Sequence, residues 1–91
     1  MPNIYEENEN TLIEIGLENV DYYSLINNYG FHFQHNNVKY DLRHWLNVYG
    51  ASVDYWGLYG RDLKTNEYTS QQSFDTFDEA VEYLKKLKLG D

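Results

Sequence analysis

Residues 52–89 read SVDYWGLYGRDLKTNEYTSQQSFDTFDEAVEYLKKLKL, and this stretch predicts a β-hairpin followed by a helix. Residues 52–61 alternate in character, as the side chains of a strand do, with one face made by Val53, Tyr55, Gly57 and Tyr59 and the other by Asp54, Trp56 and Leu58. Residues 68–74 predict the returning strand. The turn-like residues 64–67 predict a connecting loop of about four or five residues.

The segment after this hairpin carries clear helix signals. Thr76 and Glu79 form a capping box, in which the threonine hydroxyl covers the backbone amide of Glu79 and the carboxylate reaches back. Acidic residues lead and lysines trail, as the helix dipole favours, and Gly90 marks the end. The apolar stripe that predicts the buried face consists of Phe77, Ala80, Val81, Leu84 and Leu87.

Two earlier segments resemble each other, and we interpret both as short helices. Residues 21–30 and 41–50 share Asp, Asn, Tyr and Gly at matching positions, and their apolar positions recur at helical spacing. The aspartate that begins each copy is a suitable N-cap, and the glycine that ends it is a suitable residue just past a helix. A duplication is one explanation of this likeness. A strand is the alternative for the second copy, because of the alternation of Val38, Tyr40, Leu42 and His44.

Two further strands complete the expected fold. Residues 11–16 read as a short strand ended by glycine, and residues 31–35 alternate, with one face made by Phe31, Phe33 and His35. The predicted order is β-α-β-α-β-β-α, an α+β fold with a mostly antiparallel sheet. A chain of 91 residues makes one domain, which we place at residues 11–91 behind a flexible acidic segment at residues 1–10.

The composition argues against several kinds of site. The chain has no cysteine, which excludes disulfides and cysteine zinc sites. His32 and His35 point to opposite faces of a strand, so we expect no metal site. Because no P-loop, Gly-x-Ser-x-Gly or His-Glu-x-x-His motif occurs, we expect no enzyme activity and no cofactor. No apolar run is long enough to cross a bilayer, which favours a cytoplasmic location, in the host cytoplasm if a phage encodes the protein.

Charge is distributed unevenly along the chain. The formal charge is −8, and the first 38 residues contain six carboxylates but no lysine or arginine. From Lys39 onward, nine acidic residues are balanced by seven basic ones. Such an acidic front half repels nucleic acid and anionic lipid and attracts basic protein surfaces, so we expect neither direct nucleic-acid binding nor membrane binding.

Tyrosines are interleaved with these acids. Tyr is favoured at interface hot spots, because it supplies stiff contact area with one polar atom. The predicted partner-binding residues are therefore Glu14, Glu18, Asp21, Tyr22, Tyr23, Asp54 and Tyr55. Aromatic stacking on single-stranded nucleic acid also needs a cationic groove, and the few cations of this chain fall mostly at a helix end.

These features favour a small binding protein that inhibits or regulates a partner by occupying a basic surface. A nucleic-acid channel is the most natural surface of this kind, because carboxylates can replace phosphates there. In size, acidity and lack of an enzyme motif the chain resembles phage and plasmid anti-defence proteins, including anti-CRISPR and anti-restriction proteins, and acidic immunity proteins that block nuclease toxins. The alternative is a structural or self-associating α+β interaction module, with acidity serving solubility and a homo-oligomer left open.

Overall fold

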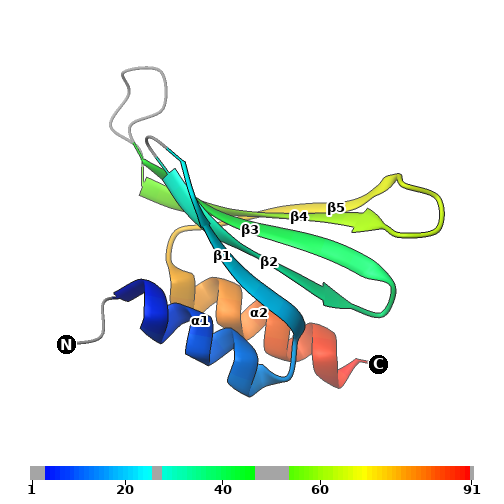
Figure 1. The fold of residues 1–91 in the computed structure, drawn as a ribbon, viewed down its shortest axis with the longest axis horizontal. Helices are drawn as coiled ribbons and strands as arrows, with labels where there is room; N and C mark the ends of the chain where they lie inside the picture. Colours follow the sequence, from blue (N-terminus) through cyan, green and yellow to red (C-terminus); the bar gives the residue numbers. More distant parts are fainter. Residues whose placement is uncertain (1–3, 26–27, 47–53, 91) are drawn as a thin grey trace.

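The computed structural model describes residues 4–25, 28–46 and 54–90. Two helices flank five consecutive strands (Figure 1). In chain order the elements are α1 (Ile4–Ile15), β1 (Glu18–Ser24), β2 (Asn28–His35), β3 (Val38–Leu46), β4 (Asp54–Asp62), β5 (Tyr68–Phe74) and α2 (Phe77–Leu89).

The strands form one antiparallel sheet in the order β1-β2-β3-β4-β5, so each strand pairs with its neighbour in the sequence. Both helices lie against the same face of this sheet, which makes a two-layer domain (Figure 1). The predicted α+β class with an antiparallel sheet is confirmed. Neither of the two described helices covers the opposite face of the sheet (Figure 1).

The core lies between the two layers. Phe31, Leu42 and Leu58 are partners across β2, β3 and β4, and each is fully buried. Leu12 of α1 and Leu84 of α2 are equally buried and cover these strands from the helical side. Replacing one such leucine with alanine typically costs about 2–5 kcal/mol, so these side chains fix the layers to each other.

The structure corrects the prediction for the start of the chain. Residues 11–16, which the sequence suggests as a strand, fall largely within α1, and residues 4–10 form the first part of the same helix. Asn8, Leu12 and Ile15 face the core at helical spacing, whereas Ile13 is 50% exposed. A strand would have placed Ile13 and Ile15 on the same face. The helical period therefore accounts for the burial, and the strand prediction is wrong.

The predicted helix over residues 21–30 is also wrong. This segment contains most of β1 and the beginning of β2, and Gly30 lies inside β2 opposite Tyr23. Tyr22 packs against the core, whereas Tyr23 faces the other side, as alternation in a strand requires. Residues 26–27 lie outside the described residues.

For residues 41–50, the structure selects the strand alternative over the helix. Residues 41–46 belong to β3, in which Tyr40 and Leu42 are buried and Asp41 and Arg43 face the other side. Residues 47–50 lie outside the described part of the chain. Pairing with β2 and β4 on both sides outweighs the helical spacing of the apolar residues, because tertiary context overrides a weak local preference.

The hairpin and the second helix agree with the sequence. The strands β4 and β5 are joined by a turn in which the Asp62 carboxylate accepts hydrogen bonds from the backbone amides of Lys64 (2.8 Å) and Thr65 (3.1 Å). At the start of α2, the Thr76 hydroxyl accepts from the Glu79 amide at 3.2 Å, which confirms the N-cap. None of the described helices is both long enough and apolar enough to span a bilayer.

Candidate functional site

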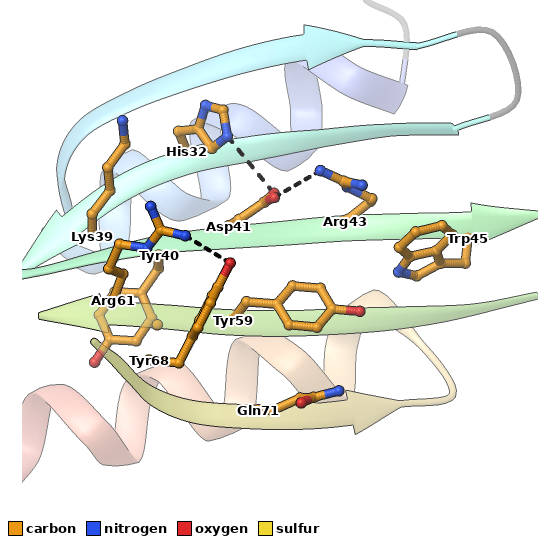
Figure 2. A pocket seen from close by; sticks show the side chains of 11 residues that line it. His32, Lys39, Tyr40, Asp41, Arg43, Trp45, Tyr59, Arg61, Tyr68 and Gln71 are labelled. Carbon is orange, nitrogen blue, oxygen red and sulfur yellow. Dashed lines mark hydrogen bonds and ion pairs between the residues drawn. The ribbon is translucent and has the colours of Figure 1, made fainter. Parts of the chain in front are cut away.

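The sheet face without helices carries a layer of polar and aromatic side chains, which we call the open face. Register partners place its residues in rows across the strands. One row runs through Gly30, Arg43 and Gly57, and the neighbouring row through His32, Asp41, Tyr59 and Gln71. Figure 2 shows these side chains rising from β2 to β5 around a shallow groove.

Arg43 is the centre of a closed set of interactions on the open face. Its guanidinium donates from Nη2 to Asp41 Oδ2 (3.0 Å) and from Nε to the Tyr23 hydroxyl (2.7 Å). The Tyr23 hydroxyl in turn donates to Asp41 Oδ1 (2.6 Å). The guanidinium carbon also lies 5.1 Å from the ring centroid of Trp45, within the range of a cation–π contact. These contacts hold Arg43 in one orientation.

The same contacts determine how these groups titrate. Burial and the hydrogen bond to Asp41 raise the pKa of Tyr23 well above its ordinary value. Burial alone would lower the pKa of Arg43, but its hydrogen bond to Tyr23 and its attraction to Asp41 raise it. Tyr23 therefore stays protonated and Arg43 stays charged at neutral pH. Both act as fixed hydrogen-bonding groups.

Two glycines make room for the aromatic rings beside Arg43. A Cβ at Gly30 would lie 2.7 Å from the Tyr23 hydroxyl and 2.6 Å from the backbone oxygen of Leu42. A Cβ at Gly57 would lie 2.7 Å from the Tyr59 hydroxyl and 3.1 Å from Trp45 Nε1. Glycine inside a strand often marks such a close approach. The rings consequently lean over the strands on both sides of Arg43.

The groove on the open face has a volume of about 540 Å³, which is within the size range of small-molecule sites. Its described lining includes three cations, Lys39, Arg43 and Arg61, together with Asp41, the Gln71 amide and several rings, among them Trp45, Tyr59 and Tyr68. Arg61 donates from Nη2 to the Tyr68 hydroxyl (2.7 Å), and its guanidinium carbon lies 4.7 Å from the Tyr68 ring centroid. Tyr68 is 71% exposed.

A second surface is acidic and lies on α1 and β1, which contact each other. We call it the acidic edge and define it by the carboxylates of these two elements: Glu6, Glu7, Glu9, Glu14, Glu18 and Asp21. Neither element contains a lysine or an arginine. The charge imbalance of the sequence thus becomes a spatial one. Lys85 and Lys88 of α2 line one hollow together with Glu14.

The structure separates the predicted partner-binding residues. Glu14, Glu18 and Asp21 are exposed on the acidic edge, whereas Tyr22 packs against the core. Tyr23 and Tyr55 lie on the open face, and the ring of Tyr55 stacks on that of Trp45 with centroids 6.4 Å apart. Asp54 pairs with His44, and the distance between Asp54 Oδ1 and His44 Nε2 is 2.6 Å. By register, Asp21 and Tyr23 share the open side of β1, whereas the neighbours Asp54 and Tyr55 of β4 lie on opposite faces of the sheet.

Sequence reasoning missed the residues that dominate the open face. These are Lys39, Asp41, Arg43, Trp45, Tyr59 and Arg61. The available signal was the alternation of residues 38–44, because the strand alternative places Lys39, Asp41 and Arg43 on the face opposite Tyr40 and Leu42. The helix interpretation of residues 41–50 concealed it. Within the described part of the chain, no three His, Asp or Glu side chains are grouped as a metal site would require.

Comparisons with protein-family models, with curated proteins and with solved structures find no match to this chain.

Proposed function

We propose that this chain is a small binding protein rather than an enzyme, and that it inhibits or regulates a partner protein by occupying a basic surface. The observation that carries the proposal is the acidic edge. Its six carboxylates belong to two adjoining elements that contain no basic residue. The partner surface is of the kind that binds nucleic acid, which corresponds to the action of phage anti-defence proteins or nuclease immunity proteins.

The physical basis is long-range attraction followed by exchange of ions. A surface of one sign accelerates association with a surface of the opposite sign. A basic nucleic-acid channel gains affinity for a polyanion by releasing condensed or bound ions, and carboxylates on a rigid helix and strand can take the places of phosphates. Of the tyrosines on β1, Tyr22 packs against the core and Tyr23 is bonded to Asp41 and Arg43, so in this proposal the docking depends on charge.

The first test is capture of a partner from host lysate at low and at high salt. The proposal expects recovery of a nucleic-acid enzyme that is lost as the salt concentration rises, and expects added DNA to compete with the chain for that enzyme. Recovery of this protein alone would contradict it.

A matched pair of variants then tests the surface itself. Glu18→Lys changes the acidic edge, whereas Glu67→Lys makes the same charge change in the exposed loop between β4 and β5. We expect Glu18→Lys to slow association with the captured enzyme several-fold and Glu67→Lys to have a much smaller effect. Equal effects would show that only net charge matters and would overturn the docking role of this edge.

The second candidate is a self-associating interaction module that uses the open face. The observation in its favour is that aromatic side chains occupy a sheet face over which no helix lies (Figure 1). Light scattering distinguishes it, because this candidate expects a dimer that dissociates when the aromatic Tyr55→Ser variant is made. A monomer at all accessible concentrations would remove this candidate and leave the first unaffected.

A further inference from the structure

We propose that the groove on the open face is a nucleotide-binding site, which takes the phosphate at Lys39 and Arg61 and stacks the base on the rings beside Tyr59. This site uses other residues than the acidic edge and does not depend on the function proposed for that edge. The ligand chemistry is that of a nucleotide, either free or as a unit of a single strand.

The anion-binding end is a pair of like charges that face each other in the sheet. Lys39 and Arg61 are direct partners across β3 and β4. Neither forms an ion pair with a described carboxylate, although Arg61 donates to the Tyr68 hydroxyl. Like charges at directly opposite positions destabilise a sheet. A bound phosphate would remove this repulsion, because it supplies negative charge and several acceptors to both cations.

The aromatic end lies one row away on the same strands. Tyr59 is two residues from Arg61 on β4, a distance of about 6.6 Å along a strand. Its ring extends along β4 toward Trp45 (Figure 2). The Tyr59 hydroxyl and Trp45 Nε1 both lie above Gly57, and Trp45 Nε1 is buried with no hydrogen-bond partner among the residues described. The Tyr59 ring thus lies between the cationic pair and Trp45 at the other end of the groove, and binding of a charged aromatic ligand requires both cations and rings (Figure 2).

A nucleotide fits this groove better than an acidic peptide does. A peptide that adds to a sheet gains affinity from backbone hydrogen bonds at a free strand edge. The groove lies over β3 and β4, and both strands are already paired on both sides. Only side chains are therefore available for recognition. Those present are rings, cations and the Gln71 amide, which suit a base and a phosphate.

The negative net charge does not prevent this binding at physiological salt. The screening length is about 8 Å under those conditions. α1, with four of the six carboxylates of the acidic edge, belongs to the layer on the other side of the sheet (Figure 1), whereas Glu18 and Asp21 of β1 are separated from the groove strands β3 and β4 by β2. Asp41 is the carboxylate in the groove lining, and it is paired with Arg43 at 3.0 Å. The structure also alters the argument made from sequence, because three cations join the aromatic residues instead of lying in a helix end.

The test is a titration of the whole chain with defined probes at physiological salt. Trp fluorescence and calorimetry measure the binding. The probes are adenosine monophosphate, a short single strand of deoxyadenylate, inorganic phosphate and oligoglutamate. Trp56 is 4% exposed in the core, so quenching by a stacked base reports on Trp45. We expect the two base-containing probes to bind and to quench. Equal affinity per site for both identifies a free nucleotide as the ligand, and much tighter binding of the strand identifies single-stranded nucleic acid.

Two sets of variants locate the binding. Lys39→Gln removes an exposed groove cation, and Lys64→Gln removes an exposed cation from the β4–β5 loop as the matched control. We expect about tenfold weaker binding for Lys39→Gln and little change for Lys64→Gln. Tyr59→Ala should weaken binding by about tenfold through loss of stacking, whereas Tyr59→Phe should retain it.

Several results would overturn the proposal. Inorganic phosphate or oligoglutamate binding as tightly as the base-containing probes would show an anion site without base recognition. Equal losses for Lys39→Gln and Lys64→Gln would place the binding elsewhere, as would full binding by Tyr59→Ala. Absence of binding by every probe, with the native melting temperature retained, would likewise exclude a nucleotide site.

Discussion

At the scale of single residues, the open face depends on hydrogen bonds that close on themselves. Tyr23, Asp41 and Arg43 contact one another through three bonds of 2.6 to 3.0 Å. Tyr23 belongs to the edge strand β1, and Asp41 and Arg43 belong to β3. The set therefore links β1 to β3 across β2. Hydrogen bonds to charged groups contribute more than neutral ones, and this set should therefore stabilise the sheet edge.

Removing the Tyr23 hydroxyl tests this role. Tyr23→Phe should lower the free energy of unfolding by about 1–2 kcal/mol, because it deletes one bond to a carboxylate and one to a guanidinium. Tyr59→Phe is the matched control, since no hydrogen bond of its hydroxyl is found among the described residues, and it should cost much less. The measurement is urea unfolding of the three proteins. Equal losses would contradict the structural role of the Tyr23 hydroxyl.

The two glycines beside Arg43 should tolerate substitution unequally. A Cβ at Gly30 would meet the backbone oxygen of Leu42 at 2.6 Å, whereas a Cβ at Gly57 would meet the ends of two side chains. Rings can move aside more readily than a paired strand, so Gly30→Ala should be the more destabilising change. A loss of about 1–3 kcal/mol is typical for such overpacking. The unfolding midpoint in urea gives the comparison, and a larger loss for Gly57→Ala would show that the rings are the more rigid element.

At the scale of elements, local signals predicted the second half of the chain. The capping residues Thr76 and Glu79 and the stripe that follows them define α2 without any long-range information. The segment 21–30 lacks such a signal, because its apolar residues satisfy both the helical and the alternating period. Its conformation depends on pairing with other strands, which spacing along one segment does not reveal.

The candidate site was not predicted, because the apolar residues of segment 41–50 also fit both the helical and the alternating period. Once residues 41–50 are interpreted as a helix, Asp41 becomes a cap and Arg43 an exposed helix residue. As a strand, the same residues bring Lys39, Asp41 and Arg43 onto one face and next to Arg61. The aromatic content was visible in the sequence, but the partners of the rings depend on strand register, which a single sequence fixes poorly.

The turn between β4 and β5 should respond to acid in a predictable direction. Hydrogen bonds from the backbone of Thr65 and then Lys64 lower the pKa of Asp62 below its ordinary value of 3.8. A lowered folded-state pKa means that this stabilisation is present above pH 3.8 and is lost as the pH falls through the pKa of the folded protein. An NMR titration should give a value under 3.8 for the Asp62 carboxyl.

The control for this titration is the same measurement in urea, where the turn is unfolded. There the Asp62 carboxyl should return to its ordinary pKa, because the backbone amides no longer converge on it. A folded value equal to the unfolded one would show that the turn does not hold these hydrogen bonds in solution.

At the scale of the whole molecule, two chemically different surfaces share one small domain. The acidic edge follows α1 and β1, while the cations of the sheet gather on the open face. This separation could be predicted in part, because the first 38 residues lack basic side chains. That Lys39, Arg43 and Arg61 would gather on one face could not be predicted, since that depends on the pairing register of β3 and β4.

Reversing two charges of the acidic edge should change association with a basic partner and leave the fold intact. In the double variant Glu14→Lys and Glu18→Lys, we expect the association rate to fall several-fold and to depend less on salt, with the melting temperature nearly unchanged. Both side chains are exposed, so surface changes of this kind have small effects on stability. Stopped-flow mixing across a salt series provides the rates, and an unchanged rate would count against the docking role.

The strict order of the strands also has a consequence for how the protein forms. Each strand from β2 to β5 pairs with the strand made just before it, and pairing between neighbours in the sequence favours rapid, stepwise formation of the sheet during synthesis. The three buried side chains of α2, by contrast, arrive only after all five strands are complete. Until then Phe31, Leu42 and Leu58 have no cover from that helix. A nascent chain halted in β5 would therefore present an exposed apolar sheet face to chaperones. Release of α2 from the ribosome would be the step that ends this exposure.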